Sequence, residues 1–312
     1  MEYILLIVGF VLLVKGADFF VDGASSIAAK LKVPSLIIGL TIVSMGTSMP
    51  EAAVSISASI GGNNGISLGN VIGSNVFNLL VVVGISSVIF PIITDKAVLK
   101  RDMPISIAIT GVLCLMLIDG QLSRLDAVIL LVLFTAYMFI LFRSALKNRT
   151  EEPSQKVMSW TKSLIFAVIG IAAIIGGGQL VVNSAKTIAA TLGMSETLIG
   201  LTVVAIGTSL PELVTSIVAA KKGDSGIAMG NVVGSNIFNV LFILGMAGVI
   251  SPMTADSTFF IDTGILIAVS AMMFLFAFTK RKTGRVEGAI SVCVYVAYTA
   301  YIIMRAYSIW IF

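Results

Sequence analysis

Long apolar segments, separated by short breaks rich in charge, glycine, proline or asparagine, dominate this sequence of 312 residues and restrict the folds open to it. Hydrophobic residues make up 57% of the chain and charged residues only 12%, about half the charged share of a soluble domain. A helix that crosses a bilayer needs about 20 mainly apolar residues, and these segments have that length. Membrane β-strands are about ten residues long with alternating polarity, which the segments lack. We therefore predict an all-α polytopic membrane protein.

The breaks divide the chain into ten expected transmembrane helices, five in each half. Their expected ranges are 3–29, 36–61, 65–90, 100–118, 123–146, 162–191, 197–221, 226–250, 256–279 and 285–310. The first repeat, helices 1 to 5, is assigned to residues 1–146, the second, helices 6 to 10, to 162–312, and 147–161 form a short linker. The chain starts without the basic segment of a cleavable signal peptide, so we expect the first apolar segment to be retained as a helix.

Lysine and arginine are concentrated in alternate breaks, which indicates the orientation of the helices. With the 147–161 linker placed in the cytoplasm, 16 of the 20 basic residues lie on the cytoplasmic side. The four exceptions are Lys15, Arg124, Lys186 and Arg305. Because cytoplasmic loops carry an excess of Lys and Arg, we expect a cell-membrane protein with both termini extracellular. The net charge of +4 reflects this topology and does not indicate nucleic-acid binding.

Two motifs occur twice, at a constant offset of 161 residues. Residues 39–54 and 200–215 are identical at 9 of 16 positions, and residues 68–84 and 229–245 at 10 of 17. Because each half has an odd number of spans, the second copy enters the membrane from the opposite side. Inverted repeats of this kind are typical of secondary transporters, which bind their substrate near the midplane between the repeats. The sequence therefore predicts two inverted five-helix repeats.

The first motif places an acid inside an apolar segment. It reads G-L-T-I-V-S-M-G-T-S-M-P-E at 39–51 and G-L-T-V-V-A-I-G-T-S-L-P-E at 200–212, ending at Glu51 and Glu212. An ionisable residue within the membrane marks a functional site by default, and two in equivalent contexts strengthen that interpretation. The alternative is a proline-kinked helix whose glutamic acid is protonated and held for packing.

The residues around each glutamate supply further oxygen atoms. Thr47, Ser48 and Glu51 share one helix face, and Pro50 disfavours the hydrogen bond to the carbonyl of Gly46. Hydroxyl, carbonyl and carboxylate oxygens together suit a hard cation such as Ca²⁺ or Na⁺. The second copy repeats the arrangement with Thr208, Ser209, Pro211 and Glu212.

The second motif combines glycine with serine and asparagine. It reads G-N-V-I-G-S-N-V-F-N at 69–78 and G-N-V-V-G-S-N-I-F-N at 230–239. Glycines four residues apart favour close helix packing, while the amides either cross-link membrane helices or bind ions. Polar pairs that share a helix face are Ser74 with Asn78 and Ser235 with Asn239, and Asn70 and Asn231 lie one turn earlier. We interpret Asn78 and Asn239 as ligands and Asn75 and Asn236 as cross-links.

Polar residues elsewhere give weaker signals. Asp18 and Asp22 lie in the first span close to Lys15, which favours an intrahelical ion pair or an outer vestibule over an ion site. The glycines at 176–178 either let a helix bend or slide, or allow close packing. Glu196 is expected as a first-turn charge at a helix N-terminus. With two cysteines and no histidine in the sequence, we expect no disulfide framework, no His-based site and no cofactor.

The two motifs resemble those of the cation/Ca²⁺ exchanger superfamily, in particular its prokaryotic and archaeal sodium/calcium exchangers. Both G-T-S-x-P-E and G-N-x-x-G-S-N occur in each half, and the resemblance spans the whole chain. It implies Ca²⁺ and Na⁺ as transported ions, sites formed by helices 2, 3, 7 and 8, and helices 1 and 6 sliding as a gate. The implied ligands are Glu51, Glu212, Thr47, Ser48, Thr208, Ser209, Ser74, Asn78, Ser235 and Asn239, with the carbonyls of Ser44 and Ala205.

One position departs from the family pattern. Well-studied members have Asp where this chain has Asn239, so the core retains only two carboxylates. Two carboxylates neutralise one Ca²⁺ or two Na⁺, which leaves the Na⁺:Ca²⁺ stoichiometry and the electrogenicity open.

We therefore predict a secondary antiporter, not an enzyme, that exchanges Na⁺ for Ca²⁺ by alternating access, with the bilayer as its surroundings and no obligatory protein partner. A proton- or K⁺-coupled exchanger would use the same glutamates, although proton-coupled members usually have G-N-x-x-E in place of G-T-S-x-P-E. A cation channel is a more distant alternative, which current recordings distinguish. An intramembrane protease lacks support because the sequence has neither histidine nor a G-x-G-D motif.

Overall fold

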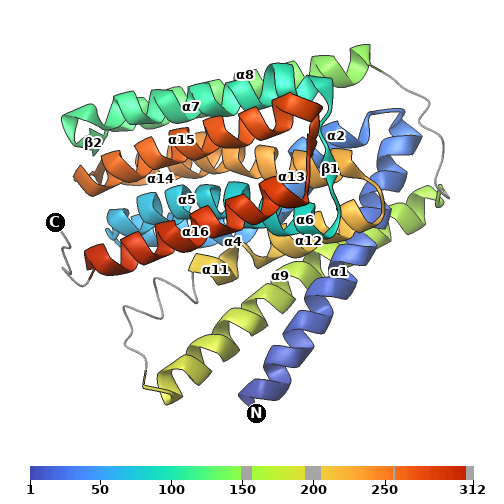
Figure 1. Ribbon diagram of the computed structural model, residues 1–312, viewed down its shortest axis with the longest axis horizontal. Coiled ribbons are helices and arrows are strands. Elements are labelled where there is room, and N and C mark those ends of the chain that lie inside the picture. Colours follow the sequence, from blue (N-terminus) through green and yellow to red (C-terminus); the bar gives the residue numbers. More distant parts are fainter. Residues whose placement is uncertain (149–156, 194–204, 256, 307–312) are drawn as a thin grey trace.

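The computed structural model describes residues 1–148, 157–193, 205–255 and 257–306, and these are almost entirely helical (Figure 1). The first half contains α1 (Glu2–Leu31), α2 (Ser35–Ile38), π-helical η1 (Gly39–Val43), α3 (Ser44–Thr47), α4 (Met49–Ile60), α5 (Asn64–Phe77), π-helical η2 (Asn78–Val82), α6 (Val83–Ile89), π-helical η3 (Val98–Asp102), α7 (Met103–Met116), the 3₁₀ turn η4 (Leu117–Asp119) and α8 (Arg124–Lys147). The second half contains α9 (Trp160–Thr191), α11 (Ala205–Thr208), α12 (Leu210–Lys221), α13 (Ser225–Phe238), π-helical η6 (Asn239–Ile243), α14 (Leu244–Ile250), α15 (Ser257–Lys280) and α16 (Arg285–Ala306).

Eight of the described helical segments are long and apolar enough to cross a membrane. A further candidate is formed by Ser35–Thr47 and Met49–Ile60, which are bent by 49° relative to each other. These segments agree closely with the spans expected from the sequence. The expected span 197–221 is described only from residue 205 onward, and Glu196 lies outside the described residues. The chain is thus an all-α, multi-pass membrane protein.

Element boundaries repeat between the two halves at the offset seen in the sequence. Adding 161 to the bounds of α3, α4, α5, η2 and α6 gives the bounds of α11, α12, α13, η6 and α14. The π-helical segments take part in the repeat, because one begins at Asn78 and the other at Asn239. The duplication in the sequence is therefore also a duplication of local backbone structure.

Two short antiparallel ribbons join the halves. The strands are β1 (Ile92–Ile93), β2 (Gln121–Leu122), β3 (Met253–Thr254) and β4 (Lys282–Thr283). In one ribbon β1 pairs with β4, and in the other β2 pairs with β3. Each ribbon therefore contains one strand from each half.

The spans Asn64–Ile89 and Ser225–Ile250 form the centre of the molecule. In the apolar window of each, 78% of the residues are buried, whereas the share is 39% or less in the other long spans. This position explains why both segments carry polar residues, because side chains here face protein and not lipid. Most helices run roughly alongside this centre, but α1 and α9 form a separate pair that leans away from it (Figure 1).

Close backbone contact joins α1 and α9 along an antiparallel interface. A Cβ atom added to Gly16 would lie 2.9 Å from the carbonyl oxygen of Gly170, and one added to Gly177 would lie 2.8 Å from that of Gly9. Small residues let membrane helices approach in this way. Among the three glycines at 176–178, Gly177 therefore serves close packing, whereas a Cβ on Gly176 would meet nothing within 4 Å.

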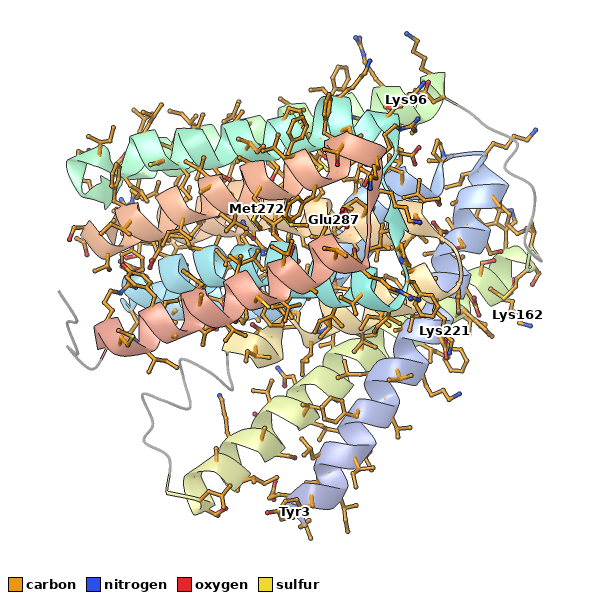
Figure 2. All side chains as sticks on the ribbon, viewed as in Figure 1. Tyr3, Lys96, Lys162, Lys221, Met272 and Glu287 are labelled. Carbon is orange, nitrogen blue, oxygen red and sulfur yellow. The ribbon has the colours of Figure 1, made fainter. Side chains whose placement is uncertain are left out.

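Basic residues gather at one end of the molecule. Figure 2 shows Lys96, Lys162 and Lys221 toward the end opposite the last described turn of α16, with Lys96 apart from the other two. This clustering fits the orientation expected from the Lys and Arg count. The placement of that end in the cytoplasm stays a prediction.

Candidate functional site

Both glutamates of the first motif lie where a helix is interrupted. The helix breaks at Ser48, with φ −83° and ψ 8°, and at Ser209, with φ −92° and ψ 6°. A proline follows in the first turn of α4 and of α12, where its missing N–H costs no helical hydrogen bond. Glu51 and Glu212 occupy the same first turns. Each carboxylate therefore lies at the N-terminal end of a half-helix inside the protein, where the helix dipole favours negative charge.

Each glutamate is bonded to the opposite half of the chain. Ser48 Oγ donates a hydrogen bond to Glu212 Oε1 at 2.7 Å, and Ser209 Oγ donates one to Glu51 Oε1 at 2.9 Å. All four residues have a relative exposure of 0%. The two carboxylates thus form one shared, fully buried site between the halves.

Asn70 fixes the backbone of the first glutamate. Its Nδ2 donates to the carbonyl oxygen of Glu51 at 3.2 Å and to Ser55 Oγ, one turn further along α4, at 2.9 Å. In the second half, Asn231 Nδ2 makes the equivalent bonds to the Glu212 carbonyl at 3.2 Å and to Ser216 Oγ at 3.0 Å. These asparagines orient the acid-bearing helices. Their nitrogen atoms bond to the backbone of each glutamate and not to its carboxylate.

Four further asparagines cross-link the central spans Asn64–Ile89 and Ser225–Ile250. Asn75 Nδ2 donates to the carbonyl of Asn236 at 3.1 Å, and Asn236 Nδ2 donates to that of Asn75 at 3.2 Å. Asn78 Nδ2 donates to Asn236 Oδ1 at 3.1 Å, and Asn239 Nδ2 donates to Asn75 Oδ1 at 3.0 Å. The nitrogen atoms of Asn78 and Asn239 are therefore engaged, which turns their amide oxygens away from these cross-links.

Four buried oxygen atoms of the site have no hydrogen-bond partner among the described residues. They are Glu51 Oε2, Glu212 Oε2, Asn78 Oδ1 and Asn239 Oδ1. A polar atom buried without a partner costs free energy, and a charged one costs more. Carboxylate and amide oxygens, one of each kind from either half, are ligands that hard cations prefer. The residues present therefore fit bound Ca²⁺ or Na⁺ as substrate.

Hydroxyl groups make further hydrogen bonds among the residues of the two motifs. Thr47 Oγ1 donates to Asn231 Oδ1 at 2.9 Å, across the boundary between the halves. Ser235 Oγ lies 3.4 Å from the Ser44 carbonyl oxygen and 3.5 Å from Glu212 Oε1.

The remaining predicted site residues lie on the same elements. Ser74 Oγ donates to the Val71 carbonyl at 3.2 Å and accepts from Asn239 Nδ2 at 3.2 Å. Thr208 is buried, and Ala205 begins α11 at the position that matches Ser44 in α3. Among the described residues, no three carboxylate, cysteine or histidine side chains gather around a common point. The site therefore depends on two acids and on neutral oxygens.

Comparison with known proteins agrees with this arrangement. The family described as "Sodium/calcium exchanger protein" matches residues 1–143 and 162–304. The chain belongs to the sodium/calcium exchanger family. The exchanger is 38% identical to the "Putative antiporter CaxA" of Alkalimonas amylolytica, over 95% of this chain and 96% of that protein. It is 36% identical to the "Sodium/calcium exchanger MaX1" of Methanosarcina acetivorans, over 95% of this chain and 97% of that protein.

A solved structure shares the fold of the exchanger. The sodium-calcium exchanger NCX_Mj, soaked with 100 mM Na⁺ and 10 mM Sr²⁺, superposes with a TM-score of 0.86 at 34% identity. The match covers 96% of this chain and 97% of that one. Together with the family match, this supports cation/Ca²⁺ antiport, and the relatives are transporters and not enzymes.

Two features of the exchanger were not predicted from its sequence. Ser55 and Ser216 each lie four residues after a glutamate, and this repetition at the 161-residue offset was the signal that could have revealed them. The second feature corrects one of the two interpretations given for Asp18 and Asp22, the intrahelical ion pair with Lys15. Among the described residues, both carboxylates lie within ion-pair distance of Lys222 and not of Lys15. The partner comes from a turn 200 residues away, which local spacing does not reveal.

Proposed function

We propose that this exchanger is a secondary antiporter that exchanges Na⁺ for Ca²⁺ by alternating access. The observation that carries the proposal is the set of four buried, partnerless oxygens among the described residues, two carboxylate and two amide, shared between the halves. The relative CaxA is named a putative antiporter, and the name of MaX1, a sodium/calcium exchanger, supplies the chemical class of the cargo. No cofactor enters the mechanism, since the transported ions are the substrates.

Charge balance explains why occupancy governs the transport step. Glu51 and Glu212 have a relative exposure of 0%, and an uncompensated carboxylate at such a position is costly. One Ca²⁺ or two Na⁺ cancel both charges. Because the two ions use overlapping oxygens, binding one displaces the other. The protein changes face only when loaded, and exchange follows without ATP.

The matched halves support the proposed transport cycle. We assign ten transmembrane helices as two inverted repeats, with the 147–161 linker in the cytoplasm and both termini outside. A site built from equivalent elements of both repeats looks alike from either side of the membrane. The α1–α9 pair is the moving part, because close backbone contact makes it one unit and it leans away from the central spans. Its displacement uncovers the site on one side and then on the other.

Uptake of ⁴⁵Ca²⁺ into proteoliposomes, under separately imposed Na⁺, K⁺ or H⁺ gradients, tests the proposal. An outward Na⁺ gradient is expected to drive uptake, and K⁺ or H⁺ gradients alone are not. Uptake driven by a pH gradient without Na⁺ would assign the glutamates to proton coupling. Single-channel currents under the same ions would show a channel, and either result would overturn Na⁺-driven antiport as the mechanism.

A further inference from the structure

Lys222 connects α1 to the turn between α12 and α13. Its Nζ lies 2.7 Å from Asp22 Oδ1, 2.8 Å from the carbonyl oxygen of Asp18 and 3.4 Å from Asp18 Oδ1. Ser25, one turn further along α1, donates its Oγ to Asp224 Oδ2 in the same turn at 3.1 Å. One face of α1 is therefore held by polar contacts to the end of the acid-bearing helix α12. We call the contacts of Lys222 with Asp18 and Asp22 the Lys222 latch.

A cavity of about 1010 Å³ adjoins the latch. Its wall combines α1, the start of α9, the segment after β1 and the α12–α13 turn. Polar residues on this wall include Asp22, Ser25, Asp95, Lys162, Asp224 and Ser225. Lys162, and Lys221 next to the latch, lie at the basic end of the molecule that we predict to be cytoplasmic (Figure 2). The latch thus lies beside a polar vestibule, between the proposed moving pair and the central helices.

The latch has no counterpart in the other half of the chain. At the 161-residue offset, Asp18 and Asp22 correspond to Gln179 and Asn183 of α9, and Lys222 corresponds to Gly61. These residues cannot form an ion pair. The site residues, by contrast, are repeated with nearly equal hydrogen-bond distances. The ion pair therefore makes one end of the molecule different from the other, whereas the site is alike in both halves.

We propose that the Lys222 latch is the cytoplasmic gate of the ion pathway, an inference that rests on the proposed function. With the latch closed, Lys222 holds α1 against the α12–α13 turn, which keeps the proposed moving pair against the central helices at this end. The Lys222 side chain is 24% exposed, and those of Asp18 and Asp22 are 38% and 47% exposed. Ion pairs this close to water are weak, so the latch can open in every cycle. Lys222 acts as a positioning residue, since it does not touch the transported ion.

Cysteine accessibility tests the latch directly. Val21 lies on α1 beside Asp22 and is 1% exposed, so Val21→Cys in a background without Cys114 and Cys293 reports opening. A membrane-impermeant methanethiosulfonate is applied from the cytoplasmic side of inside-out vesicles. Lys222→Gln and Asp22→Asn are each expected to speed labelling by about fivefold, the size expected for loss of a partly exposed ion pair. The matched control Lys221→Gln removes the same charge from the neighbouring exposed residue and leaves the labelling rate unchanged.

Charge reversal separates a gate from a merely structural contact. Combining Asp22→Lys with Lys222→Asp in an Asp18→Asn background restores the attraction and is expected to return labelling to the slow rate; the background removes the Asp18 carboxylate, which lies 3.4 Å from Lys222 Nζ and would repel the carboxylate placed at position 222. The inference fails if Lys222→Gln and Asp22→Asn label at the parental rate, or if the double reversal labels as fast as the single variants. If Lys222→Gln does not fold, Asp22→Asn and the double reversal still decide the question.

The labelling result is independent of the coupling ion. Measured without any ion gradient, it stands even if Ca²⁺ uptake proves to be driven by H⁺. Conversely, Na⁺-driven uptake with no change in labelling removes the gate and leaves the proposed function intact. Within a working antiporter, Lys222→Gln is further expected to change the half-saturating Ca²⁺ concentration on the cytoplasmic side and not on the outer side.

Discussion

Glu51 and Glu212 occupy the same position in the two halves of the molecule, and each accepts a hydrogen bond from a serine of the other half, at 2.9 and 2.7 Å. Their backbone carbonyls are held by Asn70 and Asn231 at the same distance of 3.2 Å. The two ends of the molecule differ, because only one carries the Lys222 latch. Symmetry is therefore retained where the ions would bind and is lost where they would enter. A site that must serve both faces has to look alike from each, whereas the two gates face different solutions.

The largest effect is expected from removing either carboxylate. Glu51→Gln and Glu212→Gln each leave one negative charge to balance a divalent ion in a buried site. Loss of a charged interaction of this kind is expected to lower Na⁺-driven ⁴⁵Ca²⁺ flux by about 100-fold. The comparison of the halves sharpens the prediction, because both variants are expected to lose the same activity.

The control for this pair is Glu2→Gln, which removes a carboxylate in the first turn of α1. Its flux is expected to match that of the unmodified protein. Full activity in one of the two site variants would show that only one half binds the ion, and the symmetric site would have to be abandoned.

Matched glycines test whether the symmetry extends to the α1–α9 pair. Gly16 and Gly177 are 161 residues apart, and a Cβ on either would lie 2.9 Å or less from a carbonyl oxygen of the other helix. Gly16→Ala and Gly177→Ala are each expected to lower the free energy of unfolding by about 2 kcal/mol, because the helices must separate to admit the methyl group. Thermal unfolding in detergent measures the change.

Gly176→Ala is the control on the same helix. A Cβ there meets nothing within 4 Å, and alanine favours helix over glycine by about 1 kcal/mol. The variant is expected to be as stable as the parent or slightly more stable. A loss at Gly176 equal to that at Gly177 would show that helix flexibility, and not close packing, explains these glycines.

The sequence predicted the spans and the acid pair because both depend on local patterns. The length of the apolar segments predicted the helices, and the repeated glutamates were conspicuous among apolar neighbours. It did not predict the π-helical segments that begin at Asn78 and Asn239, since no residue type requires them. The partner of Asp22 was also missed, because Lys222 reaches it only through the packing of α1 against a distant turn. The ion ligands implied by the resemblance stay a prediction, which the carboxylate variants address first.

A smaller effect is expected at the asparagines that hold the acid-bearing helices. Asn70→Ala and Asn231→Ala each remove the hydrogen bonds to a carbonyl and to a serine of the same half, and Asn231→Ala also removes the bond that Asn231 Oδ1 accepts from Thr47 Oγ1. Each is expected to lower stability by about 1 to 2 kcal/mol and to raise the half-saturating Ca²⁺ concentration several-fold, because the carboxylate loses its fixed position. Titration of ⁴⁵Ca²⁺ uptake measures the half-saturating concentration, and thermal unfolding in detergent measures the stability. Unequal shifts in Ca²⁺ affinity at equal losses of stability would show that the halves position their acids differently.

The smallest effect is expected where the halves differ beside the site. Thr215 lies three residues after Glu212 and is fully buried, and its Oγ1 has no hydrogen-bond partner among the described residues. The first half has Val54 at the matching position. Because a buried hydroxyl without a partner is unfavourable, Thr215→Val is expected to raise the free energy of unfolding by up to about 1 kcal/mol and to leave Ca²⁺ flux unchanged. The reciprocal Val54→Thr, which adds a hydroxyl to the first half, is its matched control. If Thr215→Val lowered flux while Val54→Thr did not, the Thr215 hydroxyl would belong to the ion pathway, and the asymmetry would reach the site itself.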